Sequence, residues 1–215
     1  MVFIQGDLEH MAEPFRRLGV LMTGKKDRCE ALAAYVEETL NLANTNREKI
    51  PEESRLRVMY TSGASGLGTN AEGSSQAQVI PLVGAVNAIV VEDVTSKGGG
   101  NVINLEQLYN FDPDVILFAA DSIYAESAGD ASWQQLRAIQ EDKYYEIPDL
   151  PYCWMSGPPS LNMLLGIRWL GSLLYPEIYD YDMAEEARRA YKLLWDYDMS
   201  SQEAAELLSR STGKR

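Results

Sequence analysis

The glycine-rich stretch of residues 63–75 contains the residue types that a phosphate-binding loop requires. Within it, residues 66–71 fit the pattern GxGxxA, between a predicted buried strand and a predicted helix. Such glycines let a pyrophosphate approach backbone amides at a helix N-terminus. The acidic Glu92, after the next predicted strand, would suit a ribose. The stretch is not a P-loop, because the GK[ST] ending is missing.

Three features weigh against a dinucleotide site. The match lies early in a long loop, so the helix is expected to begin nearer Ser74 and Ser75. Only about four strands are predicted, whereas a dinucleotide fold has about six. No catalytic histidine or lysine accompanies the loop. The loop therefore has three interpretations: a nucleotide site, a plain mobile loop or, as the sequence favours, the border of another ligand site.

Metal-ligating and nucleophilic residue types are scarce. His10 is the only histidine, and Cys29 and Cys153 are far apart in sequence and outside any CxxC motif. The sequence therefore predicts no metal site built from side chains, no disulfide framework and no Ser-His-Asp triad. Acid–base catalysis by a pair of the 32 acidic residues stays open, although nothing in the sequence places such a pair.

Two aromatic residues and a methionine lie together between a predicted strand and a predicted helix. Tyr152, Trp154 and Met155 are framed by Pro151 and by the Gly-Pro-Pro run of residues 157–159. A rigid apolar rim of this kind would stack on a flat ligand. The same side chains could equally fold inward as core, and the sequence leaves both interpretations open.

The segment from Asn104 to Gln107 begins a helix. Asn104 is a favourable N-cap residue, and Gln107 at the third helical position completes an arrangement like a capping box. Glu106 then lies in the first turn, where the helix dipole favours negative charge. On these residues alone, local stabilisation of the helix is the favoured interpretation of Glu106.

Composition sets the classes of partner. The chain has 215 residues, of which 19 are basic and 32 acidic, giving a formal net charge of −13. This charge argues against a nucleic-acid partner and disfavours an anionic membrane surface. No apolar run is long enough for a membrane-spanning helix. The first residues lack the pattern of a signal peptide, so we expect either a cytoplasmic protein or a piece of something longer.

Alternating predicted strands and helices indicate an α/β fold. We expect a parallel sheet of about four to five strands, with helices on both faces and a long helix of residues 25–46 before it. Ligands gather at the carboxyl ends of such strands. The predicted strands cover residues 57–61, 88–91, 115–118 and 144–147. The other predicted helices lie near residues 8–18, 79–83, 105–111, 133–139, 161–174, 183–195 and 201–209.

Several segments, in order, resemble one known family. Residues 104–116, with Asn-Leu-Glu-Gln-Leu and then Pro-Asp-Val-Ile, resemble its S-x-E-x-L-x-x-x-x-P-D-x-I signature. Residues 138–148 and 159–177 resemble its A-V-x-x-G-K-V-Y-x-V-P and P-S…W-L…L-Y-P-E segments. Residues 17–24 and the long helix after them resemble its interlobe helix, and residues 66–69 a loop of its iron-complex branch. The family comprises the class III (cluster A) substrate-binding proteins of ABC importers for ferric siderophores, haem and cobalamin.

This resemblance implies a lobe architecture. In the family, two α/β lobes are joined by one rigid helix, and the ligand lies between the lobes. Residues 1–50 would comprise N-terminal helices including the interlobe helix, and residues 51–215 the C-terminal ligand-binding lobe. The N-terminal lobe, expected before residue 1, is absent from this sequence. The resemblance implies an extracytoplasmic location, periplasmic or lipid-anchored, and an exposed surface that the missing lobe or a homodimer partner would cover.

The resemblance also implies partners and sites. The function would be capture of a metal–organic chelate and its delivery to an ABC permease, with no enzymatic activity and no cofactor. Glu106 would dock onto permease arginines. The family signature has a serine two positions before this glutamate, and this chain has Asn104 at that position. The alternative is a cytoplasmic nucleotide-binding enzyme that uses residues 66–71. The expected ligand-binding residues are Gly66, Leu67, Thr69, Ser74, Tyr124, Tyr152, Trp154 and Met155.

Overall fold

The computed structural model describes residues 8–96, 100–157 and 160–211. Its α-helices are α1 (Ala12–Leu21), α2 (Lys26–Arg47), α3 (Val79–Leu82), α4 (Leu105–Phe111), α5 (Tyr124–Ser127), α6 (Arg137–Gln140), α7 (Asn162–Leu174), α8 (Met183–Trp195) and α9 (Ser201–Leu207). Short 3-10 helices are η1 (Leu8–His10), η2 (Glu52–Ser54) and η3 (Trp133–Gln135). The strands are β1 (Arg57–Thr61), β2 (Gly68–Thr69), β3 (Val86–Asn87), β4 (Asn101–Val102), β5 (Val115–Phe118) and β6 (Tyr144–Glu146).

The centre of the fold is a four-stranded parallel sheet with strand order β3-β1-β5-β6. All four residues of β5 are buried, as expected for a strand covered on both faces. Its neighbour β1 is buried from Val58 to Thr61. Because every strand runs in the same direction, the loops after β1, β5 and β6 meet at one edge of the sheet. The predicted α/β fold with a parallel sheet is confirmed.

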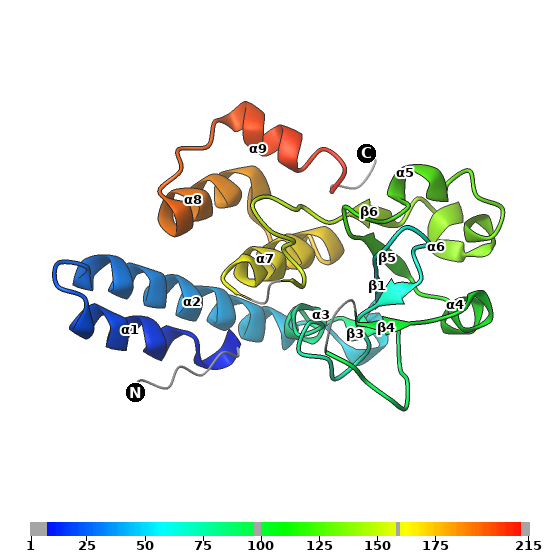
Figure 1. Ribbon diagram of the computed structural model, residues 1–215, viewed down its shortest axis with the longest axis horizontal. Helices are drawn as coiled ribbons and strands as arrows, with labels where there is room; N and C mark the ends of the chain where they lie inside the picture. Colours follow the sequence, from blue (N-terminus) through cyan, green and yellow to red (C-terminus); the bar gives the residue numbers. More distant parts are fainter. Residues whose placement is uncertain (1–7, 97–99, 158–159, 212–215) are drawn as a thin grey trace.

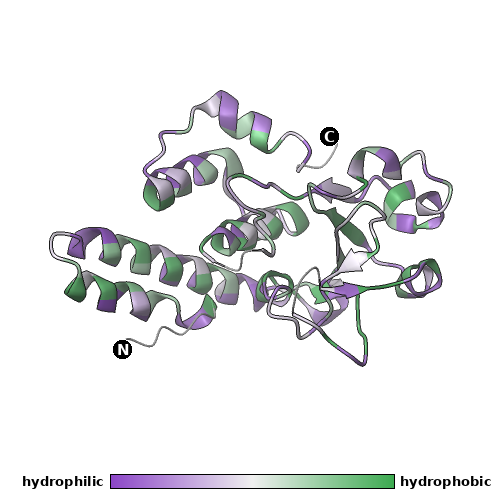
Figure 2. Ribbon diagram, in the orientation of Figure 1, coloured by the Kyte–Doolittle hydropathy of each residue, from purple (hydrophilic) through white to green (hydrophobic). Residues whose placement is uncertain are grey.

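Successive side chains of the central strands enter two separate cores. Val58 and Tyr60 of β1 pack in a core with α2, α3, α7 and α8. Met59, between them, packs on the other face in a core that includes Trp133 of η3 and Leu108 of α4. Figure 1 shows α7 beside the sheet, with α4 and α6 on the opposite side. In Figure 2, β5 and α7 are coloured largely as hydrophobic, as their burial on all sides requires.

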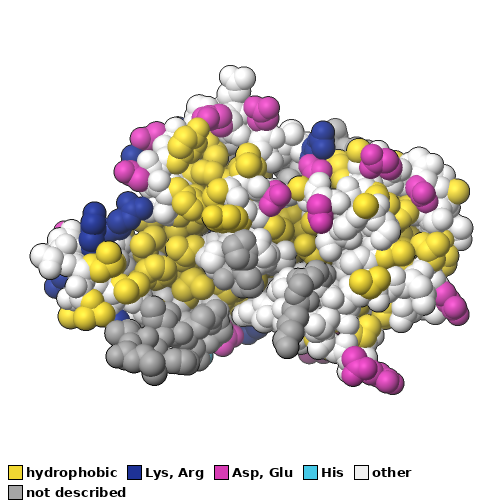
Figure 3. All heavy atoms as spheres, in the orientation of Figure 1, with side chains coloured by type: hydrophobic (Ala, Val, Ile, Leu, Met, Phe, Trp, Pro, Cys, Tyr) yellow, Lys and Arg dark blue, Asp and Glu magenta, His cyan; other side chains and the backbone are white. Residues whose placement is uncertain are grey.

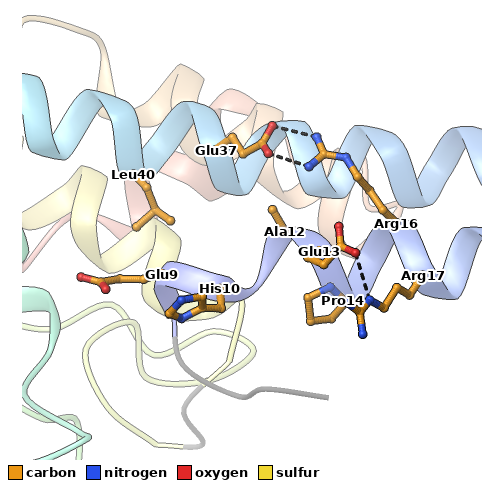
Figure 4. A pocket seen from close by; sticks show the side chains of 9 residues that line it. All are labelled: Glu9, His10, Ala12, Glu13, Pro14, Arg16, Arg17, Glu37 and Leu40. Atoms are coloured by element: carbon orange, nitrogen blue, oxygen red, sulfur yellow. Dashed lines mark hydrogen bonds and ion pairs between the residues drawn. The ribbon is translucent and has the colours of Figure 1, made fainter. Parts of the chain in front are cut away.

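Helices α1 and α2 form an antiparallel hairpin that extends away from the sheet (Figure 1). Gly24, with φ of +76°, makes the turn between them. Gly19 allows close packing, because a Cβ atom there would lie 3.0 Å from Cβ of Cys29. Arg16 of α1 forms ion pairs with Glu37 at 2.6 Å and Glu30 at 3.1 Å on α2, the first of which Figure 4 draws. The long helix predicted at residues 25–46 is confirmed as α2. No helix within the described ranges has the length and apolar character needed to cross a membrane.

A charged cluster joins α2 to the rest of the fold. The guanidinium of Arg168, in α7, is buried and donates to Thr39 Oγ1 at 2.9 Å and to Glu38 Oε1 at 2.9 Å. It also forms an ion pair with Glu186 of α8 at 3.2 Å and lies 5.0 Å from the ring centroid of Tyr35. One cation therefore connects α2, α7 and α8 and fixes the long helix on the core.

Glu38 makes the stability of this cluster depend on pH. Its hydrogen bonds from Arg189, and also from Arg168, lower its pKa from 4.5 to about 2. A carboxylate with a lowered folded-state pKa contributes stability that is complete above its unfolded-state pKa and is lost as pH falls through the folded-state value. We therefore expect this contribution to disappear between about pH 4.5 and about pH 2.

Urea unfolding midpoints of wild type and Glu38→Gln should differ at neutral pH and converge in acid. A constant difference across this range would contradict the prediction, and Glu52→Gln, at an exposed residue of η2, is the control.

Two local expectations about the elements are wrong, and one pair of strands was not expected. The strand predicted at residues 88–91 is β3, two residues earlier, because the Asn87 side chain accepts from Ile89 N at 3.0 Å and turns the backbone after Ala88. The helix predicted around residues 133–139 is divided into η3 and α6, since Leu136 between them is extended, with ψ of 133°. The unexpected pair is β2 and β4, which are antiparallel and have no periodicity of their own to predict them.

Candidate functional site at the carboxyl edge of the sheet

A pocket of about 290 Å³ lies where the loops after β1, β5 and β6 meet. This edge is where parallel α/β folds bind ligands. Loops that are distant in sequence supply its wall, so the sheet topology alone brings them together. The lining residues are Tyr60, Ser62, Asn70, Gln76, Ala119, Ala120, Asp121, Asp149, Cys153, Ser156 and Gly157.

The floor of the pocket is a chain of neutral hydrogen-bonding groups. Ser156 Oγ donates to the Tyr60 hydroxyl at 3.1 Å and lies 3.4 Å from Cys153 Sγ. Burial, together with the neighbouring Cys153, raises the pKa of Tyr60 to about 12. Burial also raises the pKa of the Cys153 thiol. Both groups are therefore protonated at neutral pH, so the thiol lacks the thiolate character of a nucleophile and serves as lining.

Two carboxylates supply the charge at the mouth. Asp121 follows β5, Asp149 follows β6, and both are exposed. Burial raises the pKa of Asp149, and the negative charge of Asp121 raises it further. Both carboxylates line the same pocket, so its charged lining residues are negative.

A second, more apolar hollow of about 810 Å³ adjoins this pocket and shares Ala120 and Asp149 with it. Its wall combines the loop after β6 with α8, α9 and the segment between them. Tyr191 lies edge-on to Trp195, with ring centroids 4.8 Å apart, and also to Tyr197. Aromatic faces of this kind take up the apolar part of a ligand. The two hollows together offer a polar end and an apolar end.

The expected site residues in the glycine-rich loop mostly serve the fold. Gly66 has φ of +69°, and a Cβ atom there would lie 2.6 Å from the ring of Trp133. Leu67 packs partly buried in the same core as Trp133. Thr69 is fully buried, and its hydroxyl donates to Tyr60 O at 2.7 Å. Ser74, also buried, lies 3.3 Å from Ser96 Oγ and lines a different hollow. None of these four residues lines the 290 Å³ pocket.

The aromatic residues expected at the site divide between core and surface. Trp154 is fully buried and donates from Nε1 to Leu150 O at 3.2 Å, and Met155 is 2% exposed. The interpretation of these two residues as an exposed rim is wrong; the core interpretation is correct. Tyr124 packs against Phe118, with ring centroids 6.0 Å apart. Tyr152 is 50% exposed and available to a ligand, so its role stays a prediction.

The interpretation of residues 66–71 as a dinucleotide-binding loop is wrong, because the backbone does not have the required strand–loop–helix arrangement. These residues do not precede a helix; Gly68 and Thr69 instead form β2, paired with β4. The next α-helix, α3, begins only at Val79 and has 4 residues. No helix N-terminus is therefore presented to a phosphate by this loop. Within the described ranges, no three His, Cys, Asp or Glu side chains are grouped to hold a metal ion.

The sequence reasoning did not identify the residues that line the pocket. Tyr60 lies in a strand that the sequence predicts as buried, and Asp121 and Asp149 are not among the predicted site residues. Their position supplied a usable signal, since Asp121 lies three residues after the end of β5 and Asp149 three after the end of β6. Polar residues directly after parallel strands lie at the ligand edge.

Solved structures share this fold. An ABC transporter solute-binding protein from Sulfurospirillum deleyianum superposes with a TM-score of 0.87 and 29% identity, covering 95% of this chain and 62% of that one. The chain has the fold of the class III solute-binding proteins of ABC transporters. A periplasmic solute-binding protein from Veillonella parvula gives a TM-score of 0.79 at 22% identity, covering 96% of this chain and 63% of that one.

Other solute-binding proteins of this fold have named ligands. The molybdate periplasmic binding protein MolA of Haemophilus influenzae has a TM-score of 0.71 at 20% identity, covering 90% of this chain and 58% of that one. This chain thus spans less than two thirds of the length of these solute-binding proteins. No protein-family model and no curated protein sequence matches it.

Proposed function

We propose that this chain is the ligand-binding part of an ABC-importer solute-binding protein and captures a metal–organic chelate outside the cytoplasm. The observation that carries the proposal is the pocket at the carboxyl edge of the sheet, within a fold shared with solute-binding proteins. Binding here requires no chemistry on the ligand. The hydroxyls of Tyr60 and Ser156 are protonated, neutral groups suited to orient a solute by hydrogen bonds.

The dimensions of the site support a chelate as the solute. The 290 Å³ pocket and the adjoining 810 Å³ hollow together suit a molecule larger than a bare ion. Structures of similar fold include a protein of a ferric hydroxamate transport system and one with bound nickel(II), at 16% and 13% identity. Ferric siderophores, haem and cobalamin remain the proposed classes.

A binding panel tests the proposal. Tryptophan fluorescence and calorimetry should show saturable binding of at least one of ferrichrome, haemin, cyanocobalamin and the nickel–histidine complex. The variant Ala120→Trp, at an exposed residue shared by both hollows, should weaken that binding about tenfold or more. Ala125→Trp, at an exposed residue of α5 outside the pocket, is the matched control. Equal binding by both variants would place the site elsewhere; no binding of any member would refute the chelate.

We also propose that Glu106 docks this lobe onto the permease. Glu106 lies exposed in the first turn of α4. The capping box between Asn104 and Gln107 fixes the start of that helix. Beside it, Val102 is 81% and Leu105 is 38% exposed. An exposed carboxylate flanked by apolar side chains suits a partner surface with arginines among apolar residues.

Replacing Glu106 separates docking from folding. A lone carboxylate in a first turn contributes only about 0.3–1 kcal/mol, so Glu106→Ala should scarcely change the melting temperature. Losing one member of an interfacial charge pair costs about 2–5 kcal/mol, so binding to the cognate permease in nanodiscs should weaken more than tenfold at unchanged ligand affinity. Glu126→Ala, at an exposed glutamate of α5, should change neither. Unchanged permease binding by Glu106→Ala would leave helix stabilisation as its only role.

The hairpin of α1 and α2 is proposed as the joining element of a two-lobe protein. Val20, Leu21 and Met22 at the end of α1 are 82%, 61% and 48% exposed. Figure 3 shows hydrophobic side chains gathered over the region of α2, α7 and α8. A second lobe is the proposed cover of this face, and a second copy of the chain is the alternative. Sedimentation equilibrium distinguishes a dimer from a monomer.

A further inference from the structure

A separate hollow of about 890 Å³ lies next to the edge strand β3. Its wall combines the end of α2, the segment before β1, the loop of residues 72–78 and α3. Figure 1 shows the end of α2 beside α3 and β3. Among the described residues, this hollow shares no lining residue with the 290 Å³ pocket or with the 810 Å³ hollow. A ligand bound here would therefore be distinct from the captured solute.

Two arginines lie close together in the wall of this hollow. Arg47 is the last residue of α2, and Arg55 lies between η2 and β1. Both approach Gly84, since a Cβ atom there would lie 3.3 Å from Cγ of Arg47. The carbonyl of Gly84 accepts from the Tyr175 hydroxyl at 3.4 Å, and that hydroxyl accepts from Leu56 N at 3.0 Å. The backbone next to Arg55 is thus fixed beside the same glycine, and both arginines line one hollow.

Neither of these arginines has a hydrogen-bond or ion-pair partner in the described part of the chain. Every other described arginine donates to a carboxylate or to a backbone carbonyl. Arg47 and Arg55 are both partly buried. Nε of Arg55 is buried without a partner, whereas its terminal nitrogens are not, so a ligand can reach those. A guanidinium that has lost water without gaining an acceptor is costly, and an anion at its accessible nitrogens would compensate.

Local stabilisation of the fold explains at most one of the two arginines. Arg47 ends the 22-residue α2, where a cation offsets the helix dipole. Arg55 follows η2, whose 3 residues are too few for a comparable dipole. Glu72 also lines the hollow, but it is exposed and forms no ion pair with either arginine within the described ranges. The two positive charges are therefore not neutralised locally, in a protein whose net charge is −13.

The rest of the lining indicates the kind of anion. A guanidinium presents a planar fork of donors that matches the oxygens of a carboxylate or a phosphate group. Hydroxyl groups lie nearby, since Ser75 N donates to Ser96 Oγ at 3.0 Å and both serines line the hollow. Pro81 and Val86, the latter 40% exposed, add apolar surface. The volume exceeds that of a bare oxyanion and suits a small organic molecule that carries one.

We propose that this hollow is a binding site for a small organic anion, whose carboxylate or phosphate group contacts Arg47 and Arg55. The inference goes beyond the proposed function, because it adds a second ligand at a second site. The two guanidiniums supply the charge, the serine hydroxyls supply further donors, and the apolar lining contacts the carbon skeleton.

Benzoate and phenyl phosphate test the site, because each joins one oxyanion to an apolar ring. Benzamide is the neutral counterpart of benzoate. Calorimetry at constant ionic strength should show saturable binding of at least one of the two anions to the wild-type chain, and none of benzamide. Binding of benzoate alone would assign a carboxylate ligand, binding of phenyl phosphate alone a phosphate ligand, and binding of both the oxyanion in general. Binding of neither anion would overturn the inference, as would equal binding of benzamide.

Removing the two charges should remove the site. Arg47→Gln/Arg55→Gln should bind the anion about tenfold more weakly or worse. Lys25→Gln/Lys26→Gln, at exposed residues outside the hollow, removes the same charge and should bind the anion as the wild-type chain does. Equal weakening by both double variants would overturn the inference, since the attraction would then come from overall charge.

A variant that keeps both arginines tests the site independently of any effect of their loss on folding. Ser75→Glu adds a carboxylate at an exposed residue of the hollow and should also weaken anion binding. Ser201→Glu, at an exposed residue of α9, is its control and should leave binding unchanged. Wild-type affinity in Ser75→Glu would overturn the inference. The proposed function is tested apart from this site, because the chelate panel and Ala120→Trp address hollows with different lining residues.

Discussion

Replacing Arg168 by alanine is expected to lower the free energy of unfolding by about 3–5 kcal/mol, the range for breaking a buried ion pair from one side. The side chain of Arg168 is 4% exposed and that of its partner Glu186 is 10% exposed. Removing the guanidinium leaves Glu186 and the buried Thr39 hydroxyl without their shared donor. It also removes the cation from the ring of Tyr35.

Two further variants test why Arg168→Ala lowers the free energy of unfolding. Arg168→Lys keeps the positive charge but lacks the planar guanidinium that contacts Thr39, Glu38 and Glu186 at the same time. We therefore expect Arg168→Lys to lower the free energy of unfolding by less than Arg168→Ala does. Arg17→Ala, which removes an exposed pair with Glu13 at 2.9 Å, should cost only about 0.3–0.5 kcal/mol. Urea unfolding monitored by circular dichroism measures all three. A loss for Arg168→Ala no larger than that for Arg17→Ala would show that the cluster adds no net stability.

The fold could be predicted where one physical signal was dominant. Residues 115–118 are wholly apolar and form the fully buried β5. The stripe at three- and four-residue spacing in α2 predicted that helix to within about one residue at each end. The capping box of Asn104 and Gln107 is present as expected. In each case local sequence and tertiary packing favour the same structure.

The fold could not be predicted where tertiary contacts decide. Strands β2 and β4 have 2 residues each and exist because they pair with one another, which no local periodicity records. The same holds for the site. Trp154 and Tyr152 are two residues apart in one loop, yet one is fully buried and the other is 50% exposed. Residue type alone could not assign them, because an aromatic side chain suits both a core and a ligand rim.

Helix α7 shows how closely the site depends on backbone packing behind it. The segment from Pro148 to Trp154 includes the pocket residues Asp149 and Cys153, and it contacts α7, whose Asn162 side chain donates to Cys153 O. Its backbone is held by a hydrogen bond from Trp154 N to Pro148 O at 3.1 Å and by the Trp154 indole to Leu150 O at 3.2 Å. Gly166 of α7 lies directly against it: a Cβ atom there would be 2.0 Å from Trp154 O.

Gly166→Ala is therefore expected to destabilise the protein by about 1–3 kcal/mol through overpacking, and to weaken ligand binding as well. The direction of the change in stability is informative, because in an unhindered helix the substitution of glycine by alanine stabilises the protein by about 1 kcal/mol. The added methyl group meets a carbonyl that is fixed by its own hydrogen bonds, so the loop must shift, and with it Asp149, Cys153 and Ser156 of the pocket. Gly129→Ala is the matched control, since Gly129 is exposed and outside the pocket, and a Cβ atom there meets only Glu126 O at 3.6 Å. Thermal unfolding, and titration with whichever chelate of the panel binds the wild-type chain, should show both losses for Gly166→Ala and neither for Gly129→Ala. Unchanged or increased stability of Gly166→Ala would mean that the loop yields freely, and that its packing against α7 does not set the shape of the pocket.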